Sequence, residues 1–156
     1  MKPLHIAFDI ALLATLATVG LGTLGWWRDQ EDSQLRMIAT AAAVQTIQTH
    51  VSMESTLGGA QLNSDGFPSS IDPRWFEGGT PLNRLAPEGA PWVELAARDE
   101  VDRVHPKQMS FSGGRHAMFW YNPTKGVVRA RVPEQASDLR MKETYSAANG
   151  ITTDAD

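Results

Sequence analysis

The chain has 156 residues, of which 42% are hydrophobic, 21% are charged and 8% are aromatic, and its formal net charge is −4 at pH 7. An acidic chain lacks the basic surface that displaces counterions from phosphates, so we expect no binding to nucleic acid. The absence of cysteine excludes a disulfide-stapled mini-protein, a thiolate nucleophile and a Cys-ligated zinc or iron–sulfur site.

The N-terminal segment is strongly apolar. The stretch Ile10–Trp27 carries no charge, and about 20 helical residues cross a hydrocarbon core of about 30 Å. The pattern therefore predicts a transmembrane anchor over residues 1–28. The acidic flank that follows favours a cytoplasmic N-terminus and an extracytoplasmic head. A cleaved signal peptide is the alternative, although Asp9 would then interrupt its apolar region.

Asp9 is an acid within this apolar segment. An ionised acid inside a bilayer costs about 2.5–3.5 kcal/mol on insertion scales, so it needs water or a partner. Asp9 either lies at the cytoplasmic edge and reaches water, or it pairs with a cation on a neighbouring subunit. The second interpretation makes the helix an assembly element and Asp9 a residue of the subunit contact.

Residues 29–58 predict an amphipathic helix that continues the anchor, because residues 29–57 contain no proline or glycine. At about 100° per residue the apolar side chains form two stripes. The first stripe contains Leu35, Ile38, Ala39, Ala42, Met53 and Leu57, and the second contains Met37, Val44, Ile47 and Val51. We expect the first stripe to pack on the head and the second to contact other subunits. The alternative is that loops of a small head cover both stripes.

Residues 59–133 predict a loop-rich β head, in which glycines, prolines and aromatic residues interrupt every regular pattern. Short strands are expected over 92–97, 116–121 and 127–132, the last two joined by the turn Asn122–Gly126. The fold class is therefore α+β, a long N-terminal transmembrane-plus-amphipathic helix packed on a small antiparallel sheet. Residues 134–156 predict a polar, partly disordered tail with a short helix over 139–145.

The sequence contains no convincing catalytic arrangement. Ser112 and His116 are close together, but entry into a strand explains this spacing better than a nucleophile and its base. Asp99, Glu100 and Asp102 offer carboxylate oxygens for calcium without the spacing of an EF-hand loop, and a solvated loop is the alternative. We therefore predict no enzymatic activity, no cofactor and no small-molecule substrate.

Three local motifs add a family resemblance. Asp65-Gly-x-Pro, the turn Leu82-Asn-Arg-Leu and the segment Tyr121–Pro133 resemble the heads of type IV pilins and type II secretion pseudopilins. The order of helix, irregular loop and small sheet is also similar to that family. The family's processing signal has a glycine before the apolar run, whereas here the chain begins Met-Lys-Pro-Leu-His and Phe8 directly precedes Asp9.

The resemblance implies a non-catalytic, membrane-anchored subunit that assembles through its N-terminal helix in a type II secretion or pilus-type filament. Its expected partners are copies of itself or other pilin-like subunits, together with the bacterial inner membrane that it crosses once. The alternative function is that of a single-pass envelope accessory protein, whose head binds a periplasmic partner without polymerising.

Overall fold

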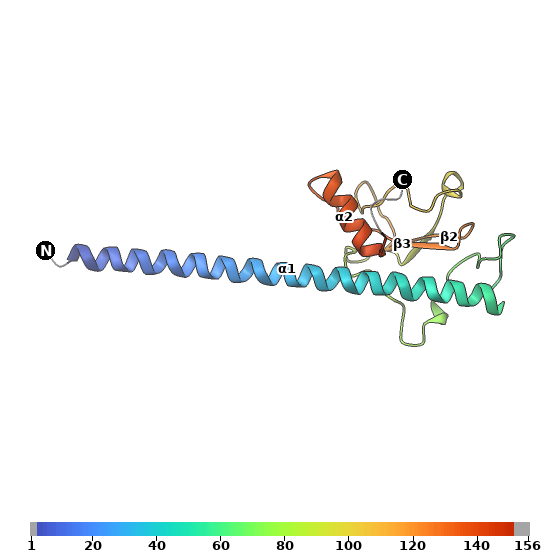
Figure 1. Cartoon of the computed structure of the whole chain (residues 1–156), viewed down its shortest axis with the longest axis horizontal. Helices are drawn as coiled ribbons and strands as arrows, with labels where there is room; N and C mark the ends of the chain where they lie inside the picture. Colours follow the sequence, from blue (N-terminus) through green and yellow to red (C-terminus); the bar gives the residue numbers. More distant parts are fainter. Residues whose placement is uncertain (1–2, 152–156) are drawn as a thin grey trace. The chain divides into compact units, whose positions relative to one another are not determined.

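The computed structural model describes the backbone of residues 3–151 and the side chains of residues 30–151 (Figure 1). The elements, in chain order, are α1 (Pro3–Leu57), η1 (Pro73–Trp75), β1 (Val93–Leu95), η2 (Arg98–Glu100), β2 (Phe119–Asn122), β3 (Val127–Ala130) and α2 (Asp138–Asn149). The chain divides into two compact units, Met1–Leu35 and Arg36–Asp156. The first unit contains only the N-terminal part of α1. The second contains the rest of α1 and every other element.

In the part of the chain that the structure describes, no helix combines the length and the apolarity needed to cross a lipid bilayer. This finding corrects the predicted transmembrane-plus-amphipathic helix and the predicted single-pass location in the inner membrane. The described side chains of α1 include those of Glu31, Asp32 and Arg36, and such charges are costly to place in hydrocarbon. The anchor predicted over residues 1–28, including Asp9, lies outside the residues whose side chains are described.

Helix α1 ends at Leu57, as the composition of residues 29–57 predicts. The next residue, Gly58, has a φ of +67°, and its amide donates to the carbonyl of Glu54 at 3.1 Å. A left-handed glycine after the last helical turn is the usual way in which a helix stops. The glycine pair that follows the apolar pattern is therefore the signal that sets this boundary.

The sheet has three strands in the order β1-β2-β3. Strands β2 and β3 are antiparallel, with Phe119 opposite Ala130, but β1 and β2 are parallel, with Val93 opposite Phe119. The prediction of a wholly antiparallel sheet is therefore wrong for β1. Parallel neighbours need a crossover of a dozen or more residues, and the long loop between β1 and β2, which contains η2, supplies it.

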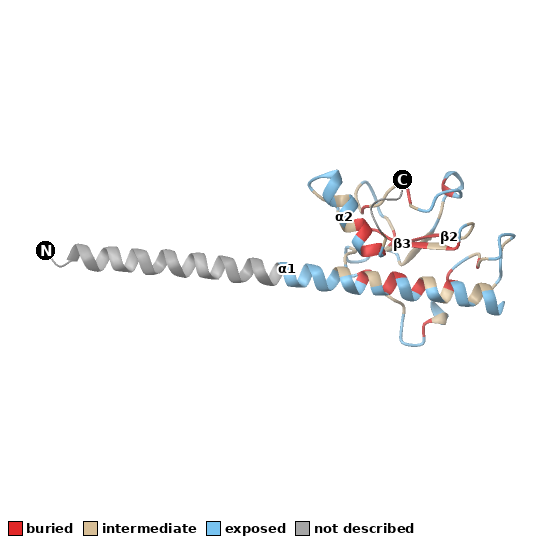
Figure 2. Cartoon of the chain, viewed as in Figure 1, coloured by how far each residue is buried: buried red, intermediate tan, exposed pale blue. Residues whose placement is uncertain are grey.

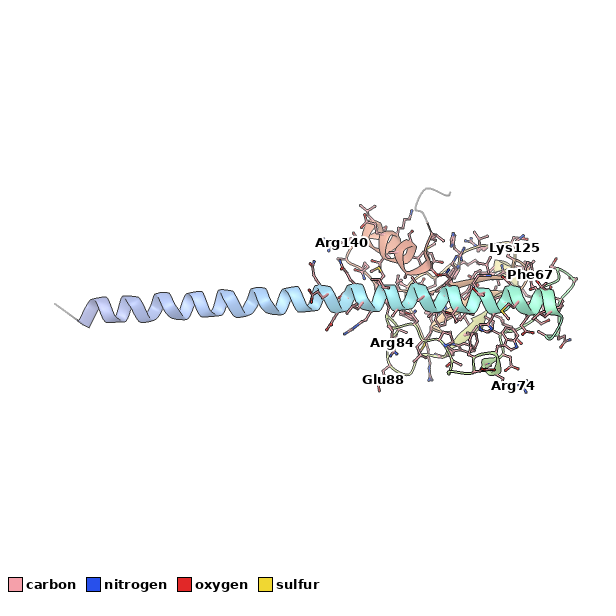
Figure 3. The ribbon with its side chains drawn as sticks, turned by 60° about the horizontal axis from the view of Figure 1, so that its bottom comes forward. Phe67, Arg74, Arg84, Glu88, Lys125 and Arg140 are labelled. Atoms are coloured by element: carbon pink, nitrogen blue, oxygen red, sulfur yellow. The ribbon has the colours of Figure 1, made fainter. Side chains whose placement is uncertain are left out.

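The hairpin between β2 and β3 confirms the predicted turn. Asn122 pairs with Val127, and its side-chain oxygen accepts from the amide of Thr124 at 3.0 Å, which is a common turn-forming contact of asparagine. Gly126 closes the loop with a φ of +61°. A β-carbon there would lie 2.3 Å from the ring of Phe67, so this ring requires a glycine beneath it. Figure 3 shows Phe67 beside the neighbouring Lys125.

The core lies between α1 and the sheet. Val44, Ile47 and Val51 of α1 are buried. They form one cluster with residues of the sheet and its loops, which include Ile71, Phe76, Phe119, Tyr121, Val128 and Ala130. Figure 2 shows the buried residues of α1 on the side that faces β2 and β3. The stripe that was expected to contact other subunits is therefore the stripe that packs on the head.

Helix α2 closes the other end of the sheet. Its N-cap is Ser137, and it continues through Asn149, further than the short helix predicted over 139–145. Tyr145 and Ala148 of α2 form a second buried cluster with Val132, against which Met37 of α1 also packs. Figures 1 and 3 place η1 and its loop on the opposite side of α1 from α2. The head and α2 therefore contact α1 from two sides over residues 36–57.

Candidate functional site

An apolar stripe remains uncovered on α1 within the second unit. It consists of Ile38, Ala42, Met53 and Leu57, and we call it the outer stripe. The exposed fractions are 66% for Ile38, 44% for Met53 and 72% for Leu57, and Ala42 is also exposed. Side chains at these positions share one side of a helix with 3.6 residues per turn. The exposed side chains of Gln45 and Thr49 lie between Ala42 and Met53 on the same side, so the outer stripe consists of two apolar patches, one at Ile38 and Ala42 and one at Met53 and Leu57.

The hydroxyl groups beside the outer stripe already have hydrogen-bond partners within the helix. Each of four exposed hydroxyls bonds to the carbonyl four residues earlier: Thr46 to Ala42, Thr49 to Gln45, Ser52 to Gln48 and Thr56 to Ser52, at 2.8–3.0 Å. Such bonds satisfy the hydroxyl donors within the helix. Covering this side of α1 therefore leaves none of these donors without an acceptor.

The buried side of α1 is fastened to the head by a polar cluster at Thr40 and Asn83. The Thr40 hydroxyl lies 3.1 Å from the side-chain oxygen of Asn83 and accepts from the amide of Arg84 at 3.0 Å. The Asn83 side-chain nitrogen donates to the carbonyls of Met118 at 3.0 Å and Arg131 at 2.7 Å. Thr40 is fully buried and Asn83 is 3% exposed. This cluster joins the helix, the loop before β1 and the strand ends in one network.

A second polar contact ties α1 to the beginning of β3. The side-chain nitrogen of Gln48 donates to the carbonyl of Gly126 at 2.6 Å, and its oxygen accepts from the amide of Val128 at 3.0 Å. β3 is an edge strand, so these backbone groups have no neighbouring strand to pair with. Gln48 therefore positions the helix and also caps the edge of the sheet.

The other outward backbone groups of β3 are capped in the same way. Asn149, at the end of α2, accepts from the amide of Ala130 at 2.7 Å and donates to its carbonyl at 3.0 Å. The guanidinium of Arg129 donates to the carbonyl of Val128 at 2.9 Å. Side chains from α1, α2 and β3 itself therefore satisfy the free edge of the strand.

A groove of about 740 Å³ runs between α1, β3 and the end of α2. Its wall on α1 includes Ala42 and Gln45, and Arg129 and Gly150 line the opposite side. Burial lowers the pKa of the Arg129 guanidinium below its ordinary value. Within residues 30–151, no carboxylate forms an ion pair with Arg129. The groove therefore contains the half-buried guanidinium of Arg129, which has no carboxylate partner among the described residues.

The three carboxylates considered for calcium have other roles. Asp99 forms an ion pair with Lys107. Glu100 is 9% exposed, and its oxygens accept from the amides of Ala97 and Lys107 and from the indole of Trp120. Burial acts to raise the pKa of Glu100, but these donors outweigh it and hold the pKa below the usual value. Among the described residues no group of three ligands is placed to hold a metal ion.

Ser112 and His116 do not form a nucleophile–base pair. The Ser112 hydroxyl lies 2.7 Å from that of Ser110 and 2.7 Å from the side-chain nitrogen of Gln108, which donates to it. This arrangement orders the turn before β2 without involving the imidazole. The interpretation of Ser112 and His116 as a strand entry therefore fits the geometry.

The residues predicted for the subunit contact lie elsewhere than expected. Val44, Ile47 and Val51 belong to the core, Met37 packs on the second cluster, and the side chain of Asp9 is outside the described residues. Periodicity shows which residues share a side of a helix, but both sides of α1 are apolar, so it does not show which side the head covers. The outer stripe was visible in the sequence but was assigned to the core.

Comparison of the chain with protein-family models, with curated proteins and with solved structures finds no match. Within residues 3–151, the fold defines an α+β protein with two α-helices and a three-stranded mixed sheet.

Proposed function

We propose that the protein is a non-catalytic, pilin-like subunit that assembles with further copies of itself into a pilus-type or type II secretion filament, using the outer stripe of α1. The support comes from the order of the elements, in which a long helix precedes a small sheet packed on its second part. The local motifs that resemble pseudopilin heads add to this support.

The observation that carries the proposal is the exposure of Ile38 and Leu57. Their exposed fractions are 66% and 72%, whereas Ile47 and Val51 on the other side of the same helix are fully buried. Burying a large aliphatic side chain contributes about 1.5–3 kcal/mol relative to leaving it exposed. Contact between copies along this stripe removes several such side chains from water at once.

A matched pair of substitutions tests the role of the outer stripe in the full chain. Ile38→Glu places a charge in the proposed contact, and Leu139→Glu places the same charge on α2 at a residue that is 67% exposed. An unpaired charge is costly to desolvate. We expect Ile38→Glu to weaken self-association at least tenfold in sedimentation experiments, and Leu139→Glu to leave it unchanged. Circular dichroism controls for the fold.

Crosslinking identifies the partner. Because the chain contains no cysteine, Ala42→Cys introduces a single thiol in the outer stripe, and Leu139→Cys provides the control. A bis-maleimide joins two such thiols, so we expect a covalent homodimer with Ala42→Cys and none with Leu139→Cys. A wild-type chain that sediments as a monomer at every concentration, or a heteromeric product in place of the homodimer in cells, would refute assembly into a filament. The heteromeric product would instead indicate a head that binds a different partner.

A further inference from the structure

Arg129 is held in the groove by groups that do not neutralise it. Its Nη1 donates to the carbonyl of Val128 at 2.9 Å, and its Nε donates to Nδ1 of His105 at 3.4 Å. The guanidinium has no acceptor, so His105 Nδ1 must be the unprotonated nitrogen in this contact. Neither partner carries a negative charge.

The surroundings of Arg129 make the absence of a negatively charged partner among the described residues significant. Burial lowers the pKa of the guanidinium, which means that the folded protein disfavours the cation there. The end of α2 lines the same groove and contributes the partial negative charge of a helix C-terminus, which is smaller than that of a carboxylate. A carboxylate with two oxygens matches the geometry of the guanidinium much better.

An acidic segment of the chain follows directly after the end of α2. Asn149 is hydrogen-bonded to Ala130, the residue next to Arg129, and Gly150 lines the groove together with Arg129. Residues 152–156 follow directly and read Thr-Thr-Asp-Ala-Asp, with two acids and no base. At about 3.3–3.6 Å per residue, the three residues from Ile151 to Asp154 span up to about 10 Å. Asp154 therefore follows within about 10 Å of Ile151, the residue next to Gly150 of the groove.

We propose that the groove is a docking site for the chain's own acidic segment 152–156, in which the carboxylate of Asp154 or Asp156 forms an ion pair with Arg129. The pair supplies the charge that the described residues lack at Arg129. It also covers the end of the groove next to α2. The inference does not depend on assembly through the outer stripe.

Carboxyl-carbon NMR titration of the full chain tests the ion pair. An arginine beside an aspartate lowers the pKa of the carboxyl group by about 1–3 units. We therefore expect the pKa of Asp154 or Asp156 to be at least one unit, or tenfold in proton affinity, lower in the wild type than in Arg129→Gln. Arg140→Gln removes an exposed guanidinium on α2 (Figure 3) and should leave both values unchanged.

The reverse experiment covers the case in which Arg129→Gln fails to fold. In Asp154→Asn/Asp156→Asn the Nε–Hε resonance of Arg129 should shift, whereas Asp138→Asn, on the exposed first turn of α2, should leave it in place. Ordinary pKa values for both aspartates in the wild type, or an Arg129 resonance insensitive to the double substitution, overturn the proposal.

Mixing labelled and unlabelled chains distinguishes the chain's own segment from that of another copy. A labelled Arg129→Gln chain is mixed with an excess of unlabelled wild-type chain. If the segment docks within its own chain, the labelled aspartates keep ordinary pKa values. A lowered pKa in the mixture would show that the acids bind Arg129 of a second copy, and it would overturn the intramolecular site.

Discussion

The contact between Thr40 and Asn83 gives a quantitative prediction about how α1 is held. Asn83→Ala removes two hydrogen bonds that the amide donates, to the carbonyls of Met118 and Arg131, and one that it accepts from the amide of Leu85 at 2.9 Å. At about 0.5–1.5 kcal/mol for each bond, the loss is about 1.5–4.5 kcal/mol. Because Asn83 is 3% exposed, water does not easily replace these bonds. We expect the free energy of unfolding to fall by about 3 kcal/mol.

Urea unfolding, followed by tryptophan fluorescence, measures this change at one low protein concentration, because self-association would add to the apparent stability. Gln135→Ala is the control, since its amide makes only a 3.4 Å bond to Pro133, and it should change stability by less than about 0.5 kcal/mol. Adding Thr40→Val completes a double-mutant cycle, in which we expect a coupling of about 0.5–3 kcal/mol. A loss below about 1 kcal/mol for Asn83→Ala, or no coupling to Thr40, would show that this polar cluster does not hold the helix.

Two further predictions concern the hairpin loop and the tyrosines. Gly126→Ala should destabilise the fold by more than Gly58→Ala, because Gly58 has a similar φ but open space around it. Phe67→Ala should reduce the difference between the two substitutions. Equal effects of the two substitutions in urea unfolding would contradict the contact between Gly126 and Phe67. Burial raises the pKa of Tyr121 to about 12 and also raises that of Tyr145. Because folding favours their protonated forms, their contribution to stability is complete below pH 10 and declines as the pH rises towards about 12. These are the only two tyrosines, so tyrosinate absorbance should rise together with unfolding, and an early rise near pH 10 with the fold intact would refute this.

Local signals in the sequence predicted several elements. The end of α1 followed from the Gly58–Gly59 pair, and the hairpin followed from two β-rich runs around Asn122–Gly126. In both cases a turn residue with a special backbone conformation sets the boundary, and such residues are recognised without tertiary information. The parallel pairing of β1 was not predicted, because it depends on the path of a long loop.

The candidate site was predicted only in part. The sequence revealed two apolar stripes on α1, but the choice between them depends on polar contacts between Gln48 and β3 and between Thr40 and Asn83. These residues are distant in sequence, and a glutamine or asparagine that bonds to a distant part of the chain has no local signature. Nothing in the local pattern around Arg129 indicated that it would have no carboxylate partner among residues 30–151.

The capped edge of β3 limits how copies of this protein can meet. A foreign strand that adds to the sheet must first displace Gln48 and Asn149 from the backbone of β3. Each of these side chains belongs to a helix, so strand addition at this edge breaks contacts that hold α1 and α2 against β3. Strand exchange and amyloid-like templating through β3 are therefore opposed by the same side chains that position the two helices.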